Sequence, residues 1–474
     1  MSDNATYTSG ADAAKADHKG GFSRVLGLGS LLAVAVGLVV SQGVMVLMLQ
    51  GAGIAGLGFI IPLAIGYILA LTYVCSYSEL SLMIPRAGSL SSYTEVAIGH
   101  FPAILAVFSG YVVVAMFALS AELLLVDFII DNIYPGVFPP MTVGFGLLAV
   151  FTVLNLLGID LFAKLQSALA FIMVFVLLTL GLSAVTGVAN PHPEGIDLTS
   201  TWNPLGAEVI TLVTLAIWGY VGAEFVCPLV EVSKNPERNI PRSMTIGITV
   251  IFATIAIYCL GALFYIPADD LAGSALPHYD FAKAVFGEAG LTFLAIAAVT
   301  ATCSTVNTSL AAIPRMLYGM AQNGQAFPQL KKLTPVTKTP WVAVLFVAAV
   351  TGLPMIIMGD NPDAIGLLLI SAAIAWLLAY IITHINVIAL RKRYPEMKRP
   401  YKTPFYPLPQ IIGIVGMIYA VIYASPAPEL SGQIFGAAVV VLSIVSVIGV
   451  FWVKVVMKKN LFEPEPIEKA HKAE

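Results

Sequence analysis

The chain has 474 residues, of which 58% are hydrophobic and 11% are charged, and its formal net charge is −3. In a water-soluble domain about a quarter of the residues are charged. This composition therefore excludes a water-soluble globule and predicts that the protein lies in a lipid bilayer. The net charge also argues against a nucleic-acid partner, which requires a clustered basic face.

In chain order, a polar stretch at residues 1–21, expected to be a disordered tail, precedes a series of apolar segments. A membrane-spanning helix needs about 20 apolar residues. The sequence predicts twelve spans, at residues 25–49, 57–83, 102–130, 140–157, 165–187, 206–231, 243–265, 284–320, 341–358, 364–390, 409–425 and 433–456. A second polar tail is expected at residues 458–474. The predicted fold class is therefore an all-α polytopic membrane protein.

The basic residues provide a check on this count. Apart from Lys283, every Lys and Arg falls in one of seven clusters, at residues 15–24, 86, 164, 234–242, 315–338, 391–402 and 454–472. Two predicted spans separate each cluster from the next, so all seven clusters lie on one side of the membrane. Basic loops prefer the cytoplasmic side, which predicts a cell-membrane protein with both termini in the cytoplasm.

Two predicted spans contain glycines and polar groups in the middle of the membrane. They are residues 37–43 in the first span, with Gly37, Ser41, Gln42 and Gly43, and residues 218–224 in the sixth. Close helix packing through small residues is one explanation. Because the two segments lie five helices apart, they also fit a pair of interrupted helices in an inverted-repeat transporter. An interrupted helix exposes backbone groups that need a ligand or water, and its free N-terminus suits a carboxylate.

Several sequence strings resemble those of the amino acid–polyamine–organocation superfamily, the amino-acid permeases. They are Tyr77-Ser78-Glu79-Leu80, Ile84-Pro85-Arg86-Ala87-Gly88, Lys234-Asn235-Pro236-Glu237-Arg238-Asn239-Ile240-Pro241-Arg242, Arg315-Met316-Leu317-Tyr318-Gly319-Met320-Ala321-Gln322-Asn323-Gly324 and Leu390-Arg391-Lys392-Arg393-Tyr394-Pro395. The resemblance extends from about residue 22 to 456 and places each string on the predicted cytoplasmic side.

The resemblance implies a five-plus-five inverted-repeat core, with repeats at residues 22–187 and 206–392 and two further helices at 403–457. It also implies alternating access, with amides around Ser41, Gln42 and Gly43 holding a substrate carboxylate. Carbonyls near Trp218, Gly219 and Gly222 would hold the amine of the substrate. Where many relatives have Gly-Ser-Gly, this chain has Ser41-Gln42-Gly43, and a lysine found in the fifth span of many relatives aligns with Met173.

Three acidic residues lie well inside predicted spans, where a carboxyl group costs at least about 2.5 kcal/mol. Glu79 is interpreted as structural, paired near Arg86 or the next loop. Glu122 belongs either to a wet outer vestibule or to an amine contact or proton-coupling group. Glu224, beside the second interruption, is interpreted as a proton carrier, gate partner or cation contact. Two acids, Glu122 and Glu224, and no basic residue near the predicted site disfavour an anionic substrate and suit a zwitterion or a cation.

The remaining candidates are polar side chains in the eighth and tenth spans. Hydroxyls commonly bond back to their own helix, but hard cations prefer oxygen ligands, so a possible ion or substrate shell is formed by Ser304, Thr305, Asn307 and Thr308. His384 is interpreted as a hydrogen-bonded packing residue, and Trp376 and Tyr380 as packing or interface aromatics.

These patterns predict a secondary importer or exchanger of neutral or cationic amino acids, driven by H⁺ or Na⁺ coupling or by exchange. The sequence predicts no bound cofactor and no structural metal, and it leaves the oligomeric state open. One alternative is a transporter of a carboxylate-free amine of the polyamine or ethanolamine type, which Gln42 and Glu122 would suit. A channel or a nutrient sensor is a further alternative. The sequence has no phosphate-binding loop, no metal-ligand cluster and no plausible nucleophile–histidine pair, so an enzyme is not expected.

Overall fold

A computed structural model of the chain describes residues 24–196, 198, 206–359, 362–425 and 428–468. The predicted tail at residues 1–21 and the last residues of the predicted 458–474 tail lie outside these ranges. Within them the chain is helical, and its one β contact is an isolated bridge between Leu26 and Ser233. The long helices are α4 (Ile60–Met83), α9 (Ile159–Thr186), α12 (Pro236–Leu263), α15 (Glu288–Gln322), α16 (Trp341–Met358), α17 (Pro362–Arg393) and α19 (Pro428–Phe451).

Three of the predicted spans consist of several consecutive segments. The first is α2 (Leu28–Val39) followed by α3 (Gln42–Ala55), and the sixth is α11 (Val213–Trp218) followed by the 3₁₀ helix η4 (Ala223–Val232). The third span is the continuous series α6 (His100–Val107), η2 (Phe108–Val113), η3 (Ala115–Leu119) and α7 (Ser120–Ile133), in which η2 and η3 are π-helical. The shorter elements are η1 (Gly56–Phe59), α5 (Leu90–Ala97), α8 (Thr142–Leu156), α10 (Ala207–Thr211), α13 (Ala268–Gly273), α14 (Pro277–Phe286), η5 (Pro328–Lys331), α18 (Leu408–Ile422) and η6 (Trp452–Val456).

The described residues contain nine helical segments that are long and apolar enough to cross a membrane. Three shorter apolar helices, α2, α8 and α18, fall below that length. One of the nine segments joins α3, η1 and α4 into a single 42-residue stretch, Gln42–Met83. The protein is thus a multi-pass membrane protein, and the count of twelve spans stays a prediction.

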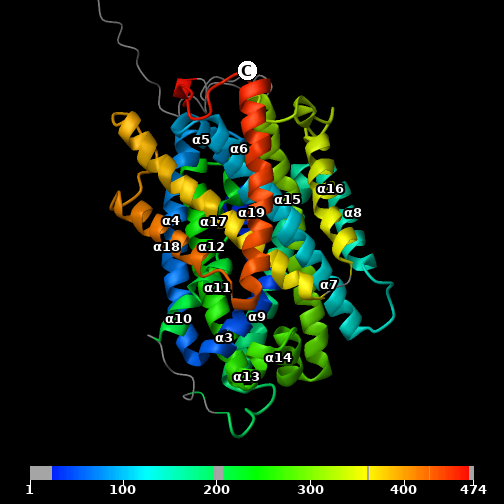
Figure 1. Ribbon diagram of the computed structural model, residues 1–474. Helices are drawn as coiled ribbons and strands as arrows, with labels where there is room; N and C mark the ends of the chain where they lie inside the picture. The colour runs from blue at the N-terminus through cyan, green and yellow to red at the C-terminus, as the bar shows by residue number, and fades with distance from the viewer. Residues whose placement is uncertain (1–23, 197, 199–205, 360–361, 426–427, 469–474) are drawn as a thin grey trace, which may run out of the picture.

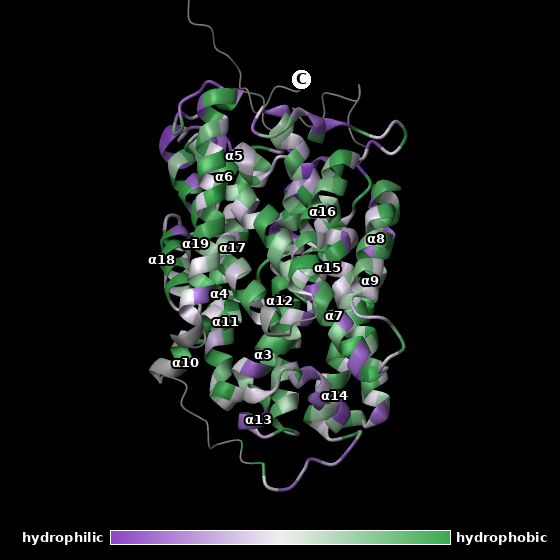
Figure 2. Cartoon of the chain, turned by 45° about the vertical axis from the view of Figure 1, so that its right-hand side comes forward, coloured by the Kyte–Doolittle hydropathy of each residue, from purple (hydrophilic) through white to green (hydrophobic). Residues whose placement is uncertain are grey.

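The bundle is apolar along its middle and polar at its two ends (Figure 2). Its outer helices expose large apolar side chains, including Phe171 at 72%, Ile356 at 70% and Val447 at 69%. Such a surface is costly in water but is the expected lipid-facing surface in a bilayer. The most buried of the membrane-spanning segments are His100–Ile133, Val209–Val232 and Ile365–Arg393. The α2 helix packs against α9, α12 and α15.

Segments that carry the basic clusters meet at one end of the bundle. Figure 1 shows α5 and the C-terminal end of α19 there, with α13 and α14 at the opposite end. The backbone N–H of Lys234 donates to the carbonyl of Leu26 over 2.8 Å, and the indole of Trp452 donates to the carbonyl of Gly324 over 2.9 Å. These contacts fit the prediction that the basic segments share one side.

Candidate functional site

The first predicted interruption is observed where α2 ends at Val39 and α3 begins at Gln42. Ser41 caps α3, because its hydroxyl accepts from the backbone N–H of Val44. The backbone N–H groups of Gln42 and Gly43 donate to the two carboxylate oxygens of Glu122, over 2.9 and 2.8 Å. The amides that the family resemblance assigned to a substrate carboxylate therefore already hold a carboxylate of the protein.

Glu122 is buried, with 2% of its surface exposed, so its interpretation as part of a wet outer vestibule is wrong. The carboxylate reaches the α3 amides from the first turn of α7. Because a helix N-terminus carries partial positive charge and free N–H groups, this position satisfies a charged group that would otherwise be costly to bury. Sequence spacing could not indicate the contact, since Gln42 and Glu122 are 80 residues apart.

The side chain of Gln42 contacts residues of two other helices, α7 and α14. Its Nε2 donates to the carbonyl of Leu125 in α7 over 3.1 Å and lies 3.4 Å from Nε2 of His278 in α14. Burial lowers the pKa of His278 to about 3, so its imidazole is neutral at physiological pH and its Nε2 can accept from Gln42. Gln42 thus connects α3 to its neighbours.

The second predicted interruption lies between Trp218, where α11 ends, and Ala223, where η4 begins. Gly222 has φ +112°, in the left-handed region that favours glycine. Its backbone N–H donates to Glu224 Oε2 and to the hydroxyl of Tyr380, over 3.1 and 3.0 Å. The backbone group freed by the interruption is therefore satisfied by side chains.

Glu224 is fully buried and receives donors from α17. The indole Nε1 of Trp376 donates to its Oε1 over 2.8 Å, and the hydroxyl of Tyr380 donates to its Oε2 over 2.7 Å. Trp376 and Tyr380 are buried against other aromatic rings, as expected for packing residues, and their bonds to Glu224 are an additional contact that the sequence did not predict. Both residues lie in an unbroken helix, so no local signal distinguished them from packing residues.

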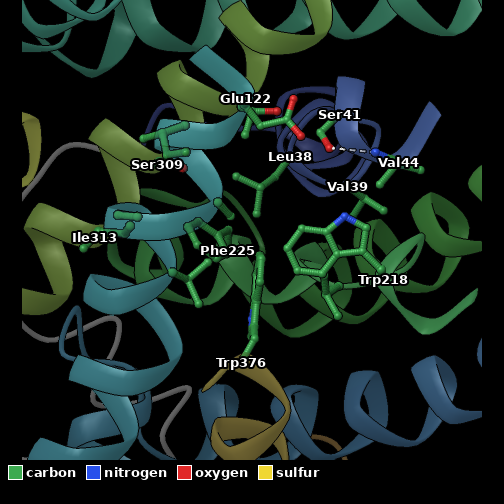
Figure 3. A pocket seen from close by; sticks show the side chains of 16 residues that line it. Leu38, Val39, Ser41, Val44, Glu122, Trp218, Phe225, Ser309, Ile313 and Trp376 are labelled. Atoms are coloured by element: carbon green, nitrogen blue, oxygen red, sulfur yellow. Dashed lines mark hydrogen bonds between the residues drawn. The ribbon is translucent and has the colours of Figure 1, made fainter. Parts of the chain in front are cut away.

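A small cavity of about 30 Å³ lies where the two interrupted helices meet α7, α15 and α17. This is room for about two water molecules. Figure 3 shows Glu122 and Ser41 on one side of the cavity, with Trp218 and Trp376 on the other. The rings of Trp218 and Trp376 meet edge to face, with centroids 5.9 Å apart.

Four of the predicted site residues line this cavity, namely Ser41, Glu122, Trp218 and Thr305. The lining also includes residues that sequence reasoning missed, namely Phe225, Ser309, Trp376 and apolar side chains from the π-helical stretch of the third span. Gly37, Gln42, Gly43, Gly219, Gly222 and Glu224 do not line it. Gly219 packs instead beside Met48, whose sulfur would lie 3.0 Å from an added Cβ.

A separate network of amides ties α2 to α9 and α15. Nε2 of Gln166 donates to Ser304 Oγ over 2.6 Å and to the carbonyl of Ala33 over 3.2 Å. A Cβ on Gly37 would lie within 2.2 Å of both Gln166 Nε2 and Ser304 Oγ, so glycine is required for this contact. The Gln166 amide also accepts from Asn307, whose own Oδ1 accepts from Asn155.

This network includes Ser304 and Asn307, two of the four residues predicted to form an ion or substrate shell in the eighth span. The Ser304 hydroxyl and the Asn307 amide are engaged by other amides, and the Thr305 hydroxyl donates to the carbonyl of Ala301. The Thr308 hydroxyl is buried without a hydrogen-bond partner among the described residues. These four residues therefore do not converge on one position. Gln166, rather than the aligned Met173, supplies the polar group that joins the fifth span to the first.

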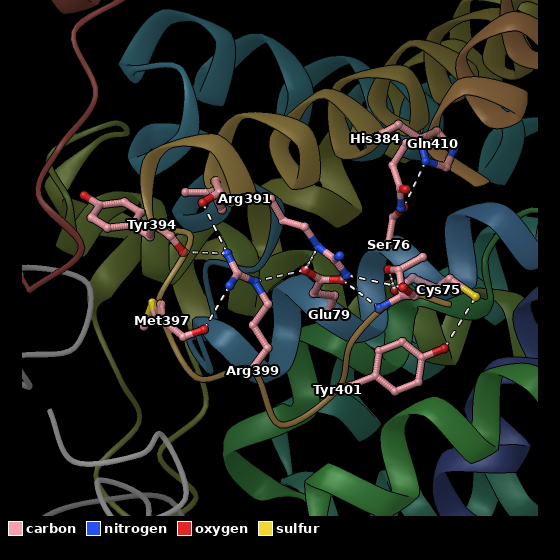
Figure 4. A network of polar contacts seen from close by, with 12 residues as sticks. Cys75, Ser76, Glu79, His384, Arg391, Tyr394, Met397, Arg399, Tyr401 and Gln410 are labelled. Atoms are coloured by element: carbon pink, nitrogen blue, oxygen red, sulfur yellow. Dashed lines mark hydrogen bonds and ion pairs between the residues drawn. The ribbon is translucent and has the colours of Figure 1, made fainter. Parts of the chain in front are cut away.

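Two other singled-out residues, Glu79 and His384, do not line the cavity. Figure 4 shows the polar contacts around them. Glu79 accepts from Arg391 Nε and Nη2 over 2.8 and 2.6 Å and lies 3.1 Å from Nε of Arg399. Its interpretation as a structural ion pair fits this geometry, but Arg86 is not the partner. His384 is buried, with Nδ1 2.9 Å from the hydroxyl of Ser76, as expected for a hydrogen-bonded packing residue.

Comparisons with known proteins agree with this architecture. The chain is 24% identical to the branched-chain amino acid permease BcaP of Bacillus subtilis, over 84% of this chain and 88% of that protein. It is 25% identical to the serine/threonine exchanger SteT of the same organism, over 84% and 90%. These relatives are transporters, not enzymes.

A solved structure, the manganese transporter of Eremococcus coleocola, covers 91% of this chain and 94% of its own, with 14% identity and a TM-score of 0.58. At this identity the likeness concerns the fold alone. The model of the amino acid permease family matches residues 26–450. The chain therefore belongs to the amino acid permease family.

Proposed function

We propose that the protein is a secondary active transporter that carries a neutral or cationic amino acid, or a closely related amine, across the cell membrane. The observation that supports this proposal is the cavity between the two interrupted helices, lined by Ser41, Glu122 and Trp218. Backbone groups freed by an interruption are tolerated in a membrane where they face a ligand or a cavity. The names of the matched permeases and exchangers support an amine-bearing cargo.

Alternating access is the mechanism that we propose for this cavity. At about 30 Å³ the cavity is too small for an amino acid, so the wall must open for cargo to enter and close again behind it. We propose that residues 22–187 and 206–392 form two inverted repeats, with α2–α3 and α11–η4 at corresponding places. The helices of 403–457 would then lie outside the repeats. The two interruptions are the hinges that this arrangement needs.

We propose that transport does not require sodium. Hydroxyl and amide oxygens of the eighth span are the ligands that a sodium ion would use, but Ser304 and Asn307 already bond to Gln166 and Asn155. The Gln166 amide thus holds α2 against α15 without a cation. We therefore propose that transport is driven by proton coupling or by exchange, with Glu224 as the proton-coupling or gating group.

Reconstitution into liposomes tests the proposal. Purified protein should take up radiolabelled cargo with saturable kinetics. Uptake should be faster when unlabelled cargo is preloaded inside, because a binding site that alternates between the two sides can return to the outside with unlabelled cargo bound. Replacing Na⁺ by K⁺ should leave the rate within about twofold. Flux that rises linearly with concentration and shows no counterflow would indicate a channel, and an absence of flux with retained cargo binding would indicate a sensor.

A further inference from the structure

The end of α3 that faces the cavity is an anion site that the protein fills itself. The α3 helix has 14 residues, and its first backbone N–H groups, those of Gln42 and Gly43, donate to both oxygens of Glu122. The next, of Val44, donates to Ser41. We propose that the cargo of this cavity is a small organic ammonium ion that has no carboxylate. This inference rests on the proposed function.

The contact between Glu122 and α3 is built into the local sequence. A Cβ on Gly43 would lie 2.7 Å from Glu122 Oε1, so glycine is what lets the carboxylate approach. Gln42 adds a third bond between the same two helices through Leu125, one turn beyond Glu122. Three hydrogen bonds therefore hold α7 against the start of α3, and freeing the amides for another anion would break two of them.

A cargo carboxylate would meet an occupied and negatively charged position. It would compete with Glu122 for the same two N–H groups and would lie beside the Glu122 charge in a buried cavity, where like charges repel strongly. The described residues that line the cavity include no Lys, Arg or His. Nothing in the wall would therefore neutralise a second carboxylate.

The same wall suits a cation. Glu122 is the one ionisable side chain among the described residues that line the cavity. The rings of Trp218, Trp376 and Phe225 face the same space, and aromatic faces attract ammonium groups. An ammonium ion could thus donate to Glu122 while Glu122 keeps its bonds to α3, since a carboxylate has about four acceptor positions.

One donor in the wall has no acceptor. Trp218 is 5% exposed, and its indole Nε1 has no hydrogen-bond partner among the described residues. It can donate to a single oxygen or to a π-electron group on the cargo. A hydroxyl satisfies it without adding charge beside Glu122. The apolar remainder, including Leu38, Val44 and Ile313, suits a short hydrocarbon body.

Matched pairs of amino acid and decarboxylated amine test the proposal on the purified full-length protein. L-serine is compared with ethanolamine, L-valine with isobutylamine and L-ornithine with putrescine, by thermal shift and by competition for uptake into liposomes. At least one amine should bind, and its amino acid should bind about a hundredfold more weakly, as expected when a buried charge is left unpaired.

Variants at Glu122 identify the residue responsible. Glu122→Gln should weaken amine binding about a hundredfold. Glu122→Ala, which vacates the α3 amides, should instead permit amino-acid binding. Asp131→Asn is the matched control, because Asp131 is an exposed acid of the same helix, and it should leave amine binding unchanged. Gel filtration and the melting temperature show whether each variant is folded.

The outcomes separate this inference from the proposed function. Amino acids that bind and are transported as well as their amines would overturn the inference and leave the transporter proposal intact. Wild-type binding of amines that Glu122→Gln leaves unchanged, in a folded protein, would also overturn the inference. A protein that neither binds nor transports any member of the three pairs or of a wider amine and amino-acid panel would overturn both.

Discussion

Glu224 is the residue on which the second interruption depends. Its two oxygens accept from Trp376, Tyr380 and the backbone N–H of Gly222, so donors from α17 and from the interruption itself converge on one carboxylate. Such a buried network is stable only while each donor has an acceptor. The carboxylate therefore couples the position of η4 to that of α17.

Replacing Glu224 by Gln should separate a structural role from a proton-coupling role. The amide presents an N–H₂ group where the carboxylate had an acceptor, so one donor of Trp376 or Tyr380 loses its bond, at a cost of about 1–3 kcal/mol. Uptake into liposomes should fall at least about tenfold, and the pH profile of the remaining uptake should flatten. Glu288→Gln, at an exposed acid, is the control. An unchanged pH profile would assign Glu224 to structure alone.

Sequence reasoning located several site residues and missed others for a physical reason. Ser41, Trp218 and Gly222 stand beside interruptions, and glycines in the middle of an apolar span mark an interruption locally. Trp376 lies inside a continuous helix, and its bond to Glu224 joins residues 152 positions apart. The contact of Glu122 with Gln42 is equally remote. Local patterns carry no signal for such contacts, so only the three-dimensional arrangement reveals them.

At the scale of elements, three spans depart from regular α-helix around the cavity. The first and sixth are interrupted, and the third contains the π-helical stretches η2 and η3. The ten-residue 3₁₀ helix η4 is also unusual, since 3₁₀ runs rarely exceed four residues. Irregular helical geometry often marks a functional site or hinge. The glycines predicted the two interruptions, but the π-helical stretches carry no comparable mark in the sequence.

Bulky side chains at two glycines should abolish transport by disturbing the interruptions. A Cβ at Gly222 would lie 2.4 Å from Leu38, and the φ of +112° is unfavourable for any other residue. A Cβ at Gly43 would lie 2.7 Å from Glu122. Gly222→Leu and Gly43→Leu should each reduce uptake by more than about tenfold while the protein still inserts in the membrane.

The control for this pair is Gly146→Leu, because Gly146 is an exposed glycine of α8 with no atom within 4 Å of an added Cβ. It should retain uptake. Membrane fractionation and gel filtration measure insertion and folding of all three variants. Normal uptake by both the Gly43 and Gly222 variants would show that neither interruption is needed for transport.

At the scale of the whole molecule, bonds between distant segments hold one end of the bundle together. Glu79 and Arg391 are 312 residues apart, and the backbone N–H of Glu465 donates to the carbonyl of Glu95 over 2.9 Å. The pattern of basic residues predicted that these segments share a side, because charge placement is a property of the whole chain. It could not predict the individual partners: Glu79 was expected to pair near Arg86 or the next loop, and its partners are Arg391 and Arg399.

The orientation of that end follows from the same charge pattern and can be measured. Lys283 is the one basic residue on the opposite side by the predicted topology, and both it and Lys338 are exposed. In a variant with Cys75, Cys227, Cys259 and Cys303 replaced by serine, Lys283→Cys should react with a membrane-impermeant maleimide on intact cells. Lys338→Cys should react only after permeabilisation, since basic loops stay in the cytoplasm.

Uptake by the cysteine-free parent shows that the fold is preserved. The reverse labelling pattern would place both termini outside the cell, and labelling of both positions on intact cells would mean that the predicted span count is wrong.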